Sequence, residues 1–391
     1  GASETNTITF QSSTGDTADV KIYYDPATAE VNYTILLDGC KYVRFNNLSL
    51  SSSGTSAFGN VILLQNEVKD IQFDGNHFYG KTGDCAFKDK YLVRDDLSTA
   101  DTSIVFIENT FENSRGFLYM DYLTNLTISN NSFINGEESY AISSLSFIEN
   151  GLIEDNFMEG SFNLYNAFGN SSNIVRNNVI THIFDLYSLN STEGKEAVVY
   201  NNFIKYKLVV RSCSYTKIYN NTVSSTACPA TVDNFCNNIT LLNNIFITSN
   251  SGYPAMDIGE IADIASENYN CLYTSGATLV KYNTVNYSTL ADWQTFSGMS
   301  ANSFNQNLTF VDAANNDLHI ASGNPDLYGT PIDKIKYDID GDLRNKTNPN
   351  IGADEYTKVP MSGEYTIGKN GTEDFASFTE AVGAIEFNGI S

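Results

Sequence analysis

The sequence has few basic residues, few prolines and no long apolar segment. Of its 391 residues, 22 are Lys or Arg and 46 are Asp or Glu, which gives a formal net charge of −24 at pH 7. A surface of this charge repels nucleic acid and anionic lipid, so nucleic acid is excluded as an ordinary partner. No run of about 18 apolar residues is present, so we expect no membrane span. The first ten residues also lack the basic and apolar parts of a signal peptide, so a secreted form would already be mature.

Common catalytic and cofactor motifs are missing as well. The sequence contains no GxSxG, P-loop or dinucleotide-binding pattern. None of the six cysteines forms a CxxC pair; they are Cys40, Cys85, Cys213, Cys228, Cys236 and Cys271. We expect buried thiols, with one or two disulfides as the alternative. Cys213 and Cys236 each precede a repeat asparagine by eight residues, so they should stack within disulfide range.

What the sequence does have is asparagine at a regular spacing. One asparagine per segment defines a column at Asn46, Asn76, Asn109, Asn131, Asn156, Asn178, Asn202, Asn221 and Asn244. From Asn109 onward the spacing averages about 22 residues. The residues three before and two after each asparagine are all apolar, as in Phe106 and Phe111 around Asn109. This strand-type alternation around a turn predicts an all-β fold, a right-handed parallel β-helix with about 22 to 24 residues per coil. A leucine-rich repeat has a similar period but needs an LxxLxLxxN pattern, which these segments lack.

The asparagines themselves are interpreted as scaffold. A short amide tolerates the left-handed backbone of a tight turn and can bond to the equivalent amide one coil away. The two longest early intervals indicate insertions at 51–59 and 81–101, and loops that protrude from a solenoid often carry its specificity. The second insertion is the first place predicted for a ligand rim, with a solvated loop as the alternative; it contains Lys81, Asp84, Lys88, Asp89, Lys90, Arg94, Asp95 and Asp96.

The regular asparagine repeat fades after Asn268. Three blocks follow, LADWQTFSGMSANSF, LTFVDAANNDLHIASGNPDLYGT and DIDGDLRNKTNPNIGADEY. They resemble the closing segment of secreted bacterial pectate-lyase-like β-helix proteins, in which D-x-D-G-x-x-R stretches precede an I-G-A-x-E ending. The resemblance covers roughly residues 30 to 356. It implies a β-helix and a secreted or cell-surface location of bacterial type, but it leaves the activity open, because such folds serve lyases, hydrolases, epimerases and adhesins.

The chain is therefore divided into three parts: β-helix coils over 1–270, a closing segment over 271–356, and a linker with a capping helix over 357–391. No cofactor is expected, with Ca²⁺ at Asp338, Asp340 and Asp342 of the closing segment as the one alternative, because alternate carboxylates in a turn offer hard oxygen ligands. The main interpretation is an ion-pair turn between these aspartates and Arg344. No EF-hand spacing is present, since Pro349 stands where the last acidic ligand would fall.

An amphipathic helix is predicted near the end of the chain. Phe375, Phe378, Val382 and Ile385 fall on one face, with Thr372 or Asp374 as N-cap and Gly389 beyond the end. In the resembling family a similar segment covers the N-terminal end of a β-helix. We therefore expect this helix to cover the first coil of a neighbouring copy or of an adjacent tandem module.

Candidates for chemistry are few. Lys205, Lys207, Arg211 and Arg176 are the candidate base and carboxylate-binding residues of a uronate lyase, because proton abstraction beside a carboxylate requires a base and a cation. Arg176, Tyr200 and Tyr219 each lie two residues before a column asparagine, so they should stack outward as a sugar-binding ladder or as a simple aromatic cover. His77, His182 and His319 are expected to be structural, and the carboxylates Glu154, Asp155, Asp185 and Glu196 form no paired hydrolase motif.

These observations favour a secreted or cell-surface β-helix module with a structural, adhesive or filament-forming role through end-to-end stacking. The expected partners are copies of the chain itself or adjacent modules, and also polysaccharide. The alternatives are a polysaccharide-active enzyme of the uronate lyase type and a carbohydrate-binding module. The sequence leaves open whether the protein is catalytic, which glycan it recognises, its oligomeric state, its disulfides and whether the chain is part of a longer protein.

Overall fold

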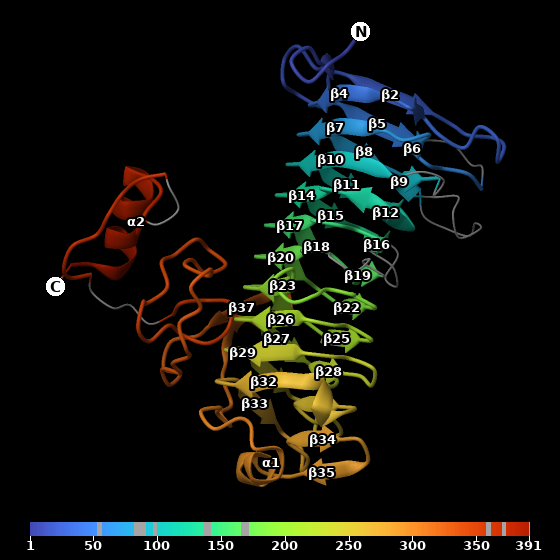
Figure 1. Ribbon diagram of the computed structural model, residues 1–391. Coiled ribbons are helices and arrows are strands. Elements are labelled where there is room, and N and C mark those ends of the chain that lie inside the picture. The colour runs from blue at the N-terminus through green and yellow to red at the C-terminus, as the bar shows by residue number, and fades with distance from the viewer. Residues whose placement is uncertain are drawn as a thin grey trace.

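The computed structural model is a parallel β-helix, the fold class that the repeats predict (Figure 1). It describes residues 1–52, 57–81, 91–96, 100–136, 142–165, 172–356, 361–369 and 373–390, with the backbone alone at 142–144 and 386–388. Within these residues the strands stack in parallel into three long sheets, and successive coils supply one strand to each sheet. Parts of both predicted insertions, including Cys85, Lys88 and Lys90, lie outside the described residues.

The strands of the three sheets follow one another in chain order. The first sheet contains β1 (Ile8–Gln11), β4 (Lys41–Asn46), β7 (Lys69–Asp74), β10 (Asp101–Ile107), β14 (Thr127–Ser129), β17 (Leu152–Glu154), β20 (Ile174–Arg176), β23 (Ala197–Tyr200), β26 (Thr216–Tyr219), β29 (Ile239–Leu242) and β32 (Ile264–Asn268), with β13 (Leu123–Thr124) beside β10. The second contains β2 (Lys21–Tyr24), β5 (Ser49–Ser52), β8 (His77–Tyr79), β11 (Thr110–Glu112), β15 (Ser132–Ile134), β18 (Phe157–Met158), β21 (Val179–Ile180), β24 (Phe203–Ile204), β27 (Thr222–Ser225), β30 (Ile245–Thr248) and β33 (Cys271–Thr274). The third contains β3 (Ile35–Asp38), β6 (Ile62–Gln65), β9 (Tyr91–Asp95), β12 (Gly116–Asp121), β16 (Ile142–Ser146), β19 (Phe162–Tyr165), β22 (Ile183–Tyr187), β25 (Lys207–Arg211), β28 (Ala230–Val232), β31 (Met256–Ile258), β34 (Val280–Tyr282) and the antiparallel β35 (Val285–Tyr287).

The apolar residues that flank the asparagine column fill the interior. All eighteen of them are buried. Like residues stack on like from coil to coil: the rings of Phe45, Phe73 and Phe106 are 5.1 Å apart at each step, and those of Phe78 and Phe111 are 4.6 Å apart. Offset aromatic stacking adds to the burial of apolar surface, so the repeat both fixes the register and supplies the core.

The asparagines form a continuous ladder at the corner between the first and second sheets. The side-chain Nδ2 of each donates to Oδ1 of the next, at 2.9 to 3.1 Å. We call this the asparagine ladder; its members are Asn76, Asn109, Asn131, Asn156, Asn178, Asn202, Asn221, Asn244 and Asn270. Each Oδ1 also accepts the backbone N–H of the preceding member, as at Asn131 and Asn156 (2.9 Å).

Two details of the predicted column are wrong. Asn46 pairs in register with Asp74, and Leu48 is the residue that aligns with ladder residue Asn76, so the first coil was read two residues out of register. The left-handed backbone belongs to the residue before each ladder asparagine, such as Asn177 (φ 55°) before Asn178. The turn thus uses two residues in sequence. The first has the left-handed backbone and is Asn, Asp or Gly in most coils, with Glu108 and Tyr269 as exceptions; the second is the ladder asparagine.

The last coil is covered by α1 (Leu290–Ser297), which begins after the N-cap Thr289. Its Trp293 is fully buried, and the indole Nε1 donates to the buried Glu267 (3.4 Å). Glu267 also accepts from Ser300 and from Nδ2 of Asn270 (2.6 Å), so the final ladder amide ends on a carboxylate. Burial raises the pKa of Glu267, and these three donors oppose the rise.

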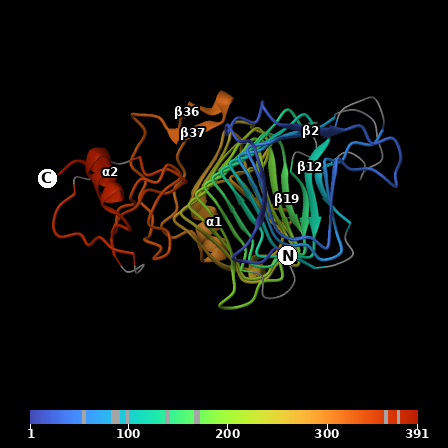
Figure 2. The same ribbon diagram turned by 90° about the horizontal axis from the view of Figure 1, so that it is seen from above.

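After α1 the chain turns back along the side of the β-helix (Figures 1 and 2). We call residues 299–356 the return segment; it contains β36 (Phe310–Asp312), η2 (Ala313–Asn315) and β37 (Asp317–Ile320), and an earlier short turn, η1 (Ile261–Asp263), precedes β32. The chain ends with α2 (Phe378–Asn388), beside the return segment. Parallel pairing continues through β33 and β34, beyond the predicted boundary at residue 270.

Candidate functional site

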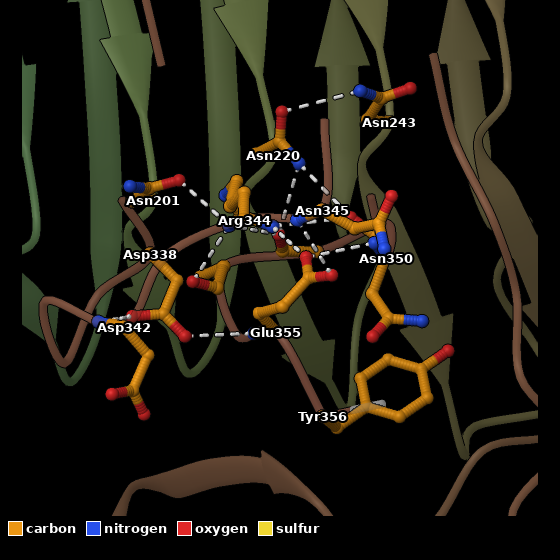
Figure 3. Close-up of polar contacts among 12 residues, drawn as sticks. Asn201, Asn220, Asn243, Asp338, Asp342, Arg344, Asn345, Asn350, Glu355 and Tyr356 are labelled. Carbon is orange, nitrogen blue, oxygen red and sulfur yellow. Dashed lines mark hydrogen bonds and ion pairs between the residues drawn. The ribbon is translucent and has the colours of Figure 1, made fainter. Parts of the chain in front are cut away.

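The return segment is fixed to the β-helix by a buried arginine (Figure 3). Arg344 is 5 % exposed, and its guanidinium donates to Asn201 Oδ1 (2.9 Å) on the β-helix turn and to the Gly352 and Ala353 carbonyls (2.9 Å each). Its ion-pair partner is Glu355 (3.3 Å). Burial raises the pKa of Glu355 to about 7, and Arg344 opposes this rise by favouring the charged carboxylate. The D-x-D-G-x-x-R and I-G-A-x-E blocks are therefore a structural latch in this chain.

Gly352 in the second of these blocks has a steric cause. Its φ is +86°, a conformation that residues with a Cβ rarely adopt, and an added Cβ would lie 2.5 Å from Ile245 Cδ1. The Gly352 N–H donates to the Asn243 carbonyl (2.7 Å), so the return segment lies directly on the turn before Asn244.

The three aspartates suggested for Ca²⁺ do not converge. Asp338 is fully buried, and its carboxylate accepts the backbone N–H groups of Asp340 (3.0 Å), Asp342 (2.8 Å) and Glu355 (2.9 Å). Asp340 points the other way, toward His319 Nε2 (2.7 Å). In the described part of the chain, the group of three potential ligands that the structure does bring together is His319, Asp340 and Asp354.

The predicted ladder of Arg176, Tyr200 and Tyr219 is present. The three residues are in register across β20, β23 and β26. Arg176 donates to the Tyr200 hydroxyl (2.8 Å) and pairs with Glu154 (2.5 Å). Tyr200 is only 8 % exposed, so its ring face is not available for stacking, whereas Tyr219 is half-buried. Burial raises the pKa of both hydroxyls.

Residues 332–335 of the return segment pass over this ladder and turn it into a pocket. The pocket has a volume of about 470 Å³. We call it the tyrosine pocket; its lining includes Tyr200, Tyr219, Lys195, Lys217, Lys334 and Glu196. Three lysines thus line the same pocket as the two tyrosines. This is a local concentration of positive charge, because the whole chain has only 22 basic residues and a net charge of −24. Asp333 also lines the pocket, so lysines exceed carboxylates by one there.

The four basic residues proposed for a lyase are not gathered at one place. Arg211, in the third sheet, forms an ion pair with Asp185 and lies over the Tyr187 ring (5.0 Å), whereas Arg176 is in the first sheet. Lys207 begins β25 and Lys205 lies at the turn before it. The structure therefore joins Arg176 to the tyrosines and separates it from the other three residues.

The other predicted groups are distributed as follows. His77 pairs with Glu112 (3.0 Å), and His182 stacks on Tyr206 (4.8 Å). Cys40, Cys213, Cys228, Cys236 and Cys271 are free thiols, four of them buried, and burial raises the pKa of Cys213 to about 12. Of the charged insertion, Lys81 bonds Asp25 (2.7 Å).

The terminal helix begins later than predicted. Ser377 is the N-cap and accepts from the Glu380 N–H (3.2 Å), because Asp374 is already held by Thr366 and Lys346; Thr372 lies outside the described residues. Gly389 follows the helix end as expected. Phe375 precedes the helix and is buried, whereas Phe378 is 74 % exposed; Val382 and Ile385 also face outward.

Two parts of the site were missed by the sequence reasoning. The cover at 332–335 has no local signal, because it reaches the tyrosines from more than a hundred residues away. The cluster around His319 did have a local sequence signal: Asp317 and His319 are two residues apart in an extended segment, so their side chains must lie on the same face.

Comparisons of the chain with protein-family models, curated proteins and solved structures found no match. The structure itself gives the class of protein: a parallel β-helix whose return segment is fixed to the coils by the buried Arg344. No helix in the described ranges is long and apolar enough to cross a membrane.

Proposed function

We propose that the chain is a secreted or cell-surface β-helix module that binds acidic polysaccharide in the tyrosine pocket. The observation that carries this proposal is the meeting of Lys195, Lys217 and Lys334 with the half-buried ring of Tyr219. An aromatic face stacks on the apolar face of a sugar ring, and ammonium groups attract its carboxylate. Because the rest of the surface is strongly acidic, the lysines would be the local point of attraction for a uronate.

Binding rather than catalysis is the activity that the arrangement supports. The charge of Arg176, in the first sheet, is neutralised by Glu154. Arg211 forms its ion pair with Asp185, and both of these residues are in the third sheet. A uronate lyase needs a base placed against the proton beside the carboxylate, and the four predicted basic residues are divided between two faces.

The test is a binding titration with uronic-acid oligosaccharides of increasing length. Tyr219→Ala and Lys217→Ala should each weaken binding about five- to tenfold, which corresponds to about 1 kcal/mol for a stacking or charge contact. Tyr253→Ala is the matched control, since Tyr253 is 46 % exposed and lies outside the pocket. Equal affinities for wild type and both pocket variants would overturn the proposal. An unsaturated uronate product detected by ultraviolet absorbance would instead establish the lyase.

End-to-end stacking is a second candidate, favoured by two exposed faces. In the first coil Ile8 and Phe10 are 49 % and 50 % exposed, and Phe10 is the open end of the aromatic stack on Phe45 (5.4 Å). On α2, Phe378 and Ile385 face outward. We propose that α2 of a second copy covers the first coil, since an apolar helix face can shield both the unpaired strand edge and the stack.

A further inference from the structure

The return segment borders a second hollow on the other side of the asparagine ladder. We call it the flank groove; it has a volume of about 470 Å³, and its lining includes Phe157, Val179, Phe203, Asp155, His319 and Asp340. Phe157, Val179 and Phe203 are in register along the second sheet, so they form its apolar floor. His319 and Asp340 stand in its wall.

His319 is held between carboxylates. Its Nδ1 contacts Asp317 Oδ1 (2.5 Å), its Nε2 contacts Asp340 Oδ2 (2.7 Å), and its ring meets Phe203 edge-on (4.9 Å). A ring nitrogen bonded to a carboxylate fixes the imidazole so that the other nitrogen points in a defined direction, as in carboxylate–histidine–metal arrangements. Here Asp317 has the orienting position at Nδ1, and Nε2 faces Asp340.

Asp354 supplies the independent observation. It is 9 % exposed, and within the described residues its one hydrogen bond is a long contact from the Ile320 N–H (3.4 Å). A buried carboxylate normally has a cation or several donors around it. An oxygen of Asp354, an oxygen of Asp340 and a ring nitrogen of His319 all lie within 4.8 Å of one another. The carboxylate is thus buried beside a histidine nitrogen and a second carboxylate with little else to compensate its charge.

The geometry points to a divalent transition-metal site formed by His319, Asp340 and Asp354, with Asp317 orienting the imidazole. One imidazole and two carboxylates suit a borderline cation such as Zn²⁺, whereas Ca²⁺ and Mg²⁺ prefer oxygen ligands throughout. Two ligands of a tetrahedral Zn²⁺ lie about 3.3 Å apart, so the present His319–Asp340 contact must open by a few tenths of an ångström. Three protein ligands leave a position open, and two of them line the groove.

This site is independent of the tyrosine pocket, which faces the first sheet, and it is tested with the metal alone. Protein stripped with chelator is titrated with Zn²⁺ by calorimetry, and Co²⁺ is added separately to record its visible absorption. We expect one site per chain, with Ca²⁺ bound at least tenfold more weakly. Asp340→Asn, on the half-exposed ligand, should lower Zn²⁺ affinity at least tenfold without affecting the fold, and Asp354→Asn and His319→Gln should do the same.

His77→Gln is the control, because His77 pairs with a single carboxylate, Glu112. It should bind Zn²⁺ as the wild type does. Retained affinity in both Asp340→Asn and His319→Gln, or absence of binding by the wild type at 100-fold excess of metal over protein, would overturn the site. Equal affinity for Ca²⁺ would overturn the assignment to a transition metal. Circular dichroism of each variant shows whether a loss of binding comes from unfolding.

Discussion

At the scale of single residues, the ladder asparagines hold the corner of the coil by satisfying backbone groups that no strand partner reaches. Asn178 Nδ2 donates to the Ile153 carbonyl (3.0 Å), the Arg176 carbonyl (2.8 Å) and Asn202 Oδ1 (3.0 Å). Its own Oδ1 accepts from both nitrogens of Asn156. This side chain shares its two N–H hydrogens among three acceptors and accepts two N–H groups at its oxygen, and no other amino acid of this length offers both functions in a buried corner.

Asn178→Ala should therefore lower the free energy of unfolding by about 3 kcal/mol, because it leaves several buried donors and acceptors without partners. Asn46→Ala is the matched control: the sequence pattern places Asn46 in the same column, but it is outside the ladder, so its loss should cost less than about 0.5 kcal/mol. Urea unfolding followed by circular dichroism measures both. Equal costs would show that the ladder contributes little to stability.

Asp101 should make stability depend on pH. It is 1 % exposed, it accepts the Val68 N–H (2.8 Å) with one oxygen, and its other oxygen, Oδ2, is buried with no hydrogen-bond partner among the described residues. Burial raises its pKa to about 6, and Asp96 and Glu67 add to the rise. An unfolded aspartate titrates near 3.9, so between about 4 and 6 the native state binds more protons and the free energy of unfolding falls as pH rises.

Asp101→Asn removes this titration and keeps an oxygen acceptor for Val68. Relative to the variant, the wild type should lose about 1 to 2 kcal/mol of stability between pH 4.5 and pH 7. Unfolding curves at half-unit pH intervals measure the difference. The control is Asp333→Asn, at an exposed position; its free energy of unfolding should depend on pH as that of the wild type does. If the difference in unfolding free energy between the wild type and Asp101→Asn does not change with pH, Asp101 does not have the raised pKa.

At this scale most of the ladder could be predicted from the residue identities alone. The ladder members from Asn76 to Asn244 and their apolar neighbours are predictable because a fixed offset repeats in every coil. Asn46 was misassigned because the first coil offers Leu48 at the ladder position, and Asn47 has the left-handed backbone there. Asn270 was missed because the apolar pattern around it ends where α1 takes over the cover.

At the scale of elements, the return segment adds no further coil to the β-helix. It is a strap along the side of the coils, stabilised by the buried Arg344–Glu355 ion pair and by backbone contacts such as the Gly352 N–H to the Asn243 carbonyl (2.7 Å). Arg344 and Glu355 are 5 % and 2 % exposed. Removing one partner from such a pair leaves an uncompensated charge in a dry site, which costs far more than the loss of an exposed pair.

Arg344→Met should destabilise the return segment by about 3 to 5 kcal/mol. Hydrogen exchange should then show faster exchange over 299–356 than over the ladder coils. Lys281→Met is the control, because its ion pair with Asp257 is closer to the surface, with side chains 40 % and 27 % exposed; its cost should stay within about 1 kcal/mol. Adding Glu355→Gln to Arg344→Met should recover part of the loss. Unchanged exchange in Arg344→Met would mean that other contacts hold the strap.

The candidate site was half predictable at this scale. Register along the first sheet places Arg176, Tyr200 and Tyr219 in a row, and a constant offset from the asparagines reveals it. The cover that makes a pocket of that row comes from 332–335, and nothing in a single sequence reports contacts at such separation. The start of α2 was misplaced because Thr366 and Lys346, both outside the helix, compete for Asp374.

At the scale of the whole molecule, charge opposes the stacking of copies. Each copy has a net charge of −24, so association through the first coil and α2 should strengthen as salt screens the repulsion. Sedimentation velocity over a range of protein and salt concentrations measures this. Phe10→Glu and Phe378→Glu should each prevent chain growth alone, while an equal mixture of the two forms dimers through the intact faces. A monomer at every salt concentration would exclude stacking, and Tyr253→Glu should associate as the wild type does.

The ladder also has a direction. Every ladder asparagine donates to the ladder oxygen of the next coil, so the side chains form a head-to-tail row of dipoles whose donor end is Asn270 and whose last acceptor is the Glu267 carboxyl group. A negative charge is favourable at the donor end of aligned dipoles. The row of dipoles therefore ends at the Glu267 carboxyl group, and the buried Trp293, which donates to the same carboxyl group, covers this end of the ladder. An engineer who wished to lengthen the rod would splice extra coils between Asn109 and Asn244, where both neighbours can receive them, and would leave the covered end untouched.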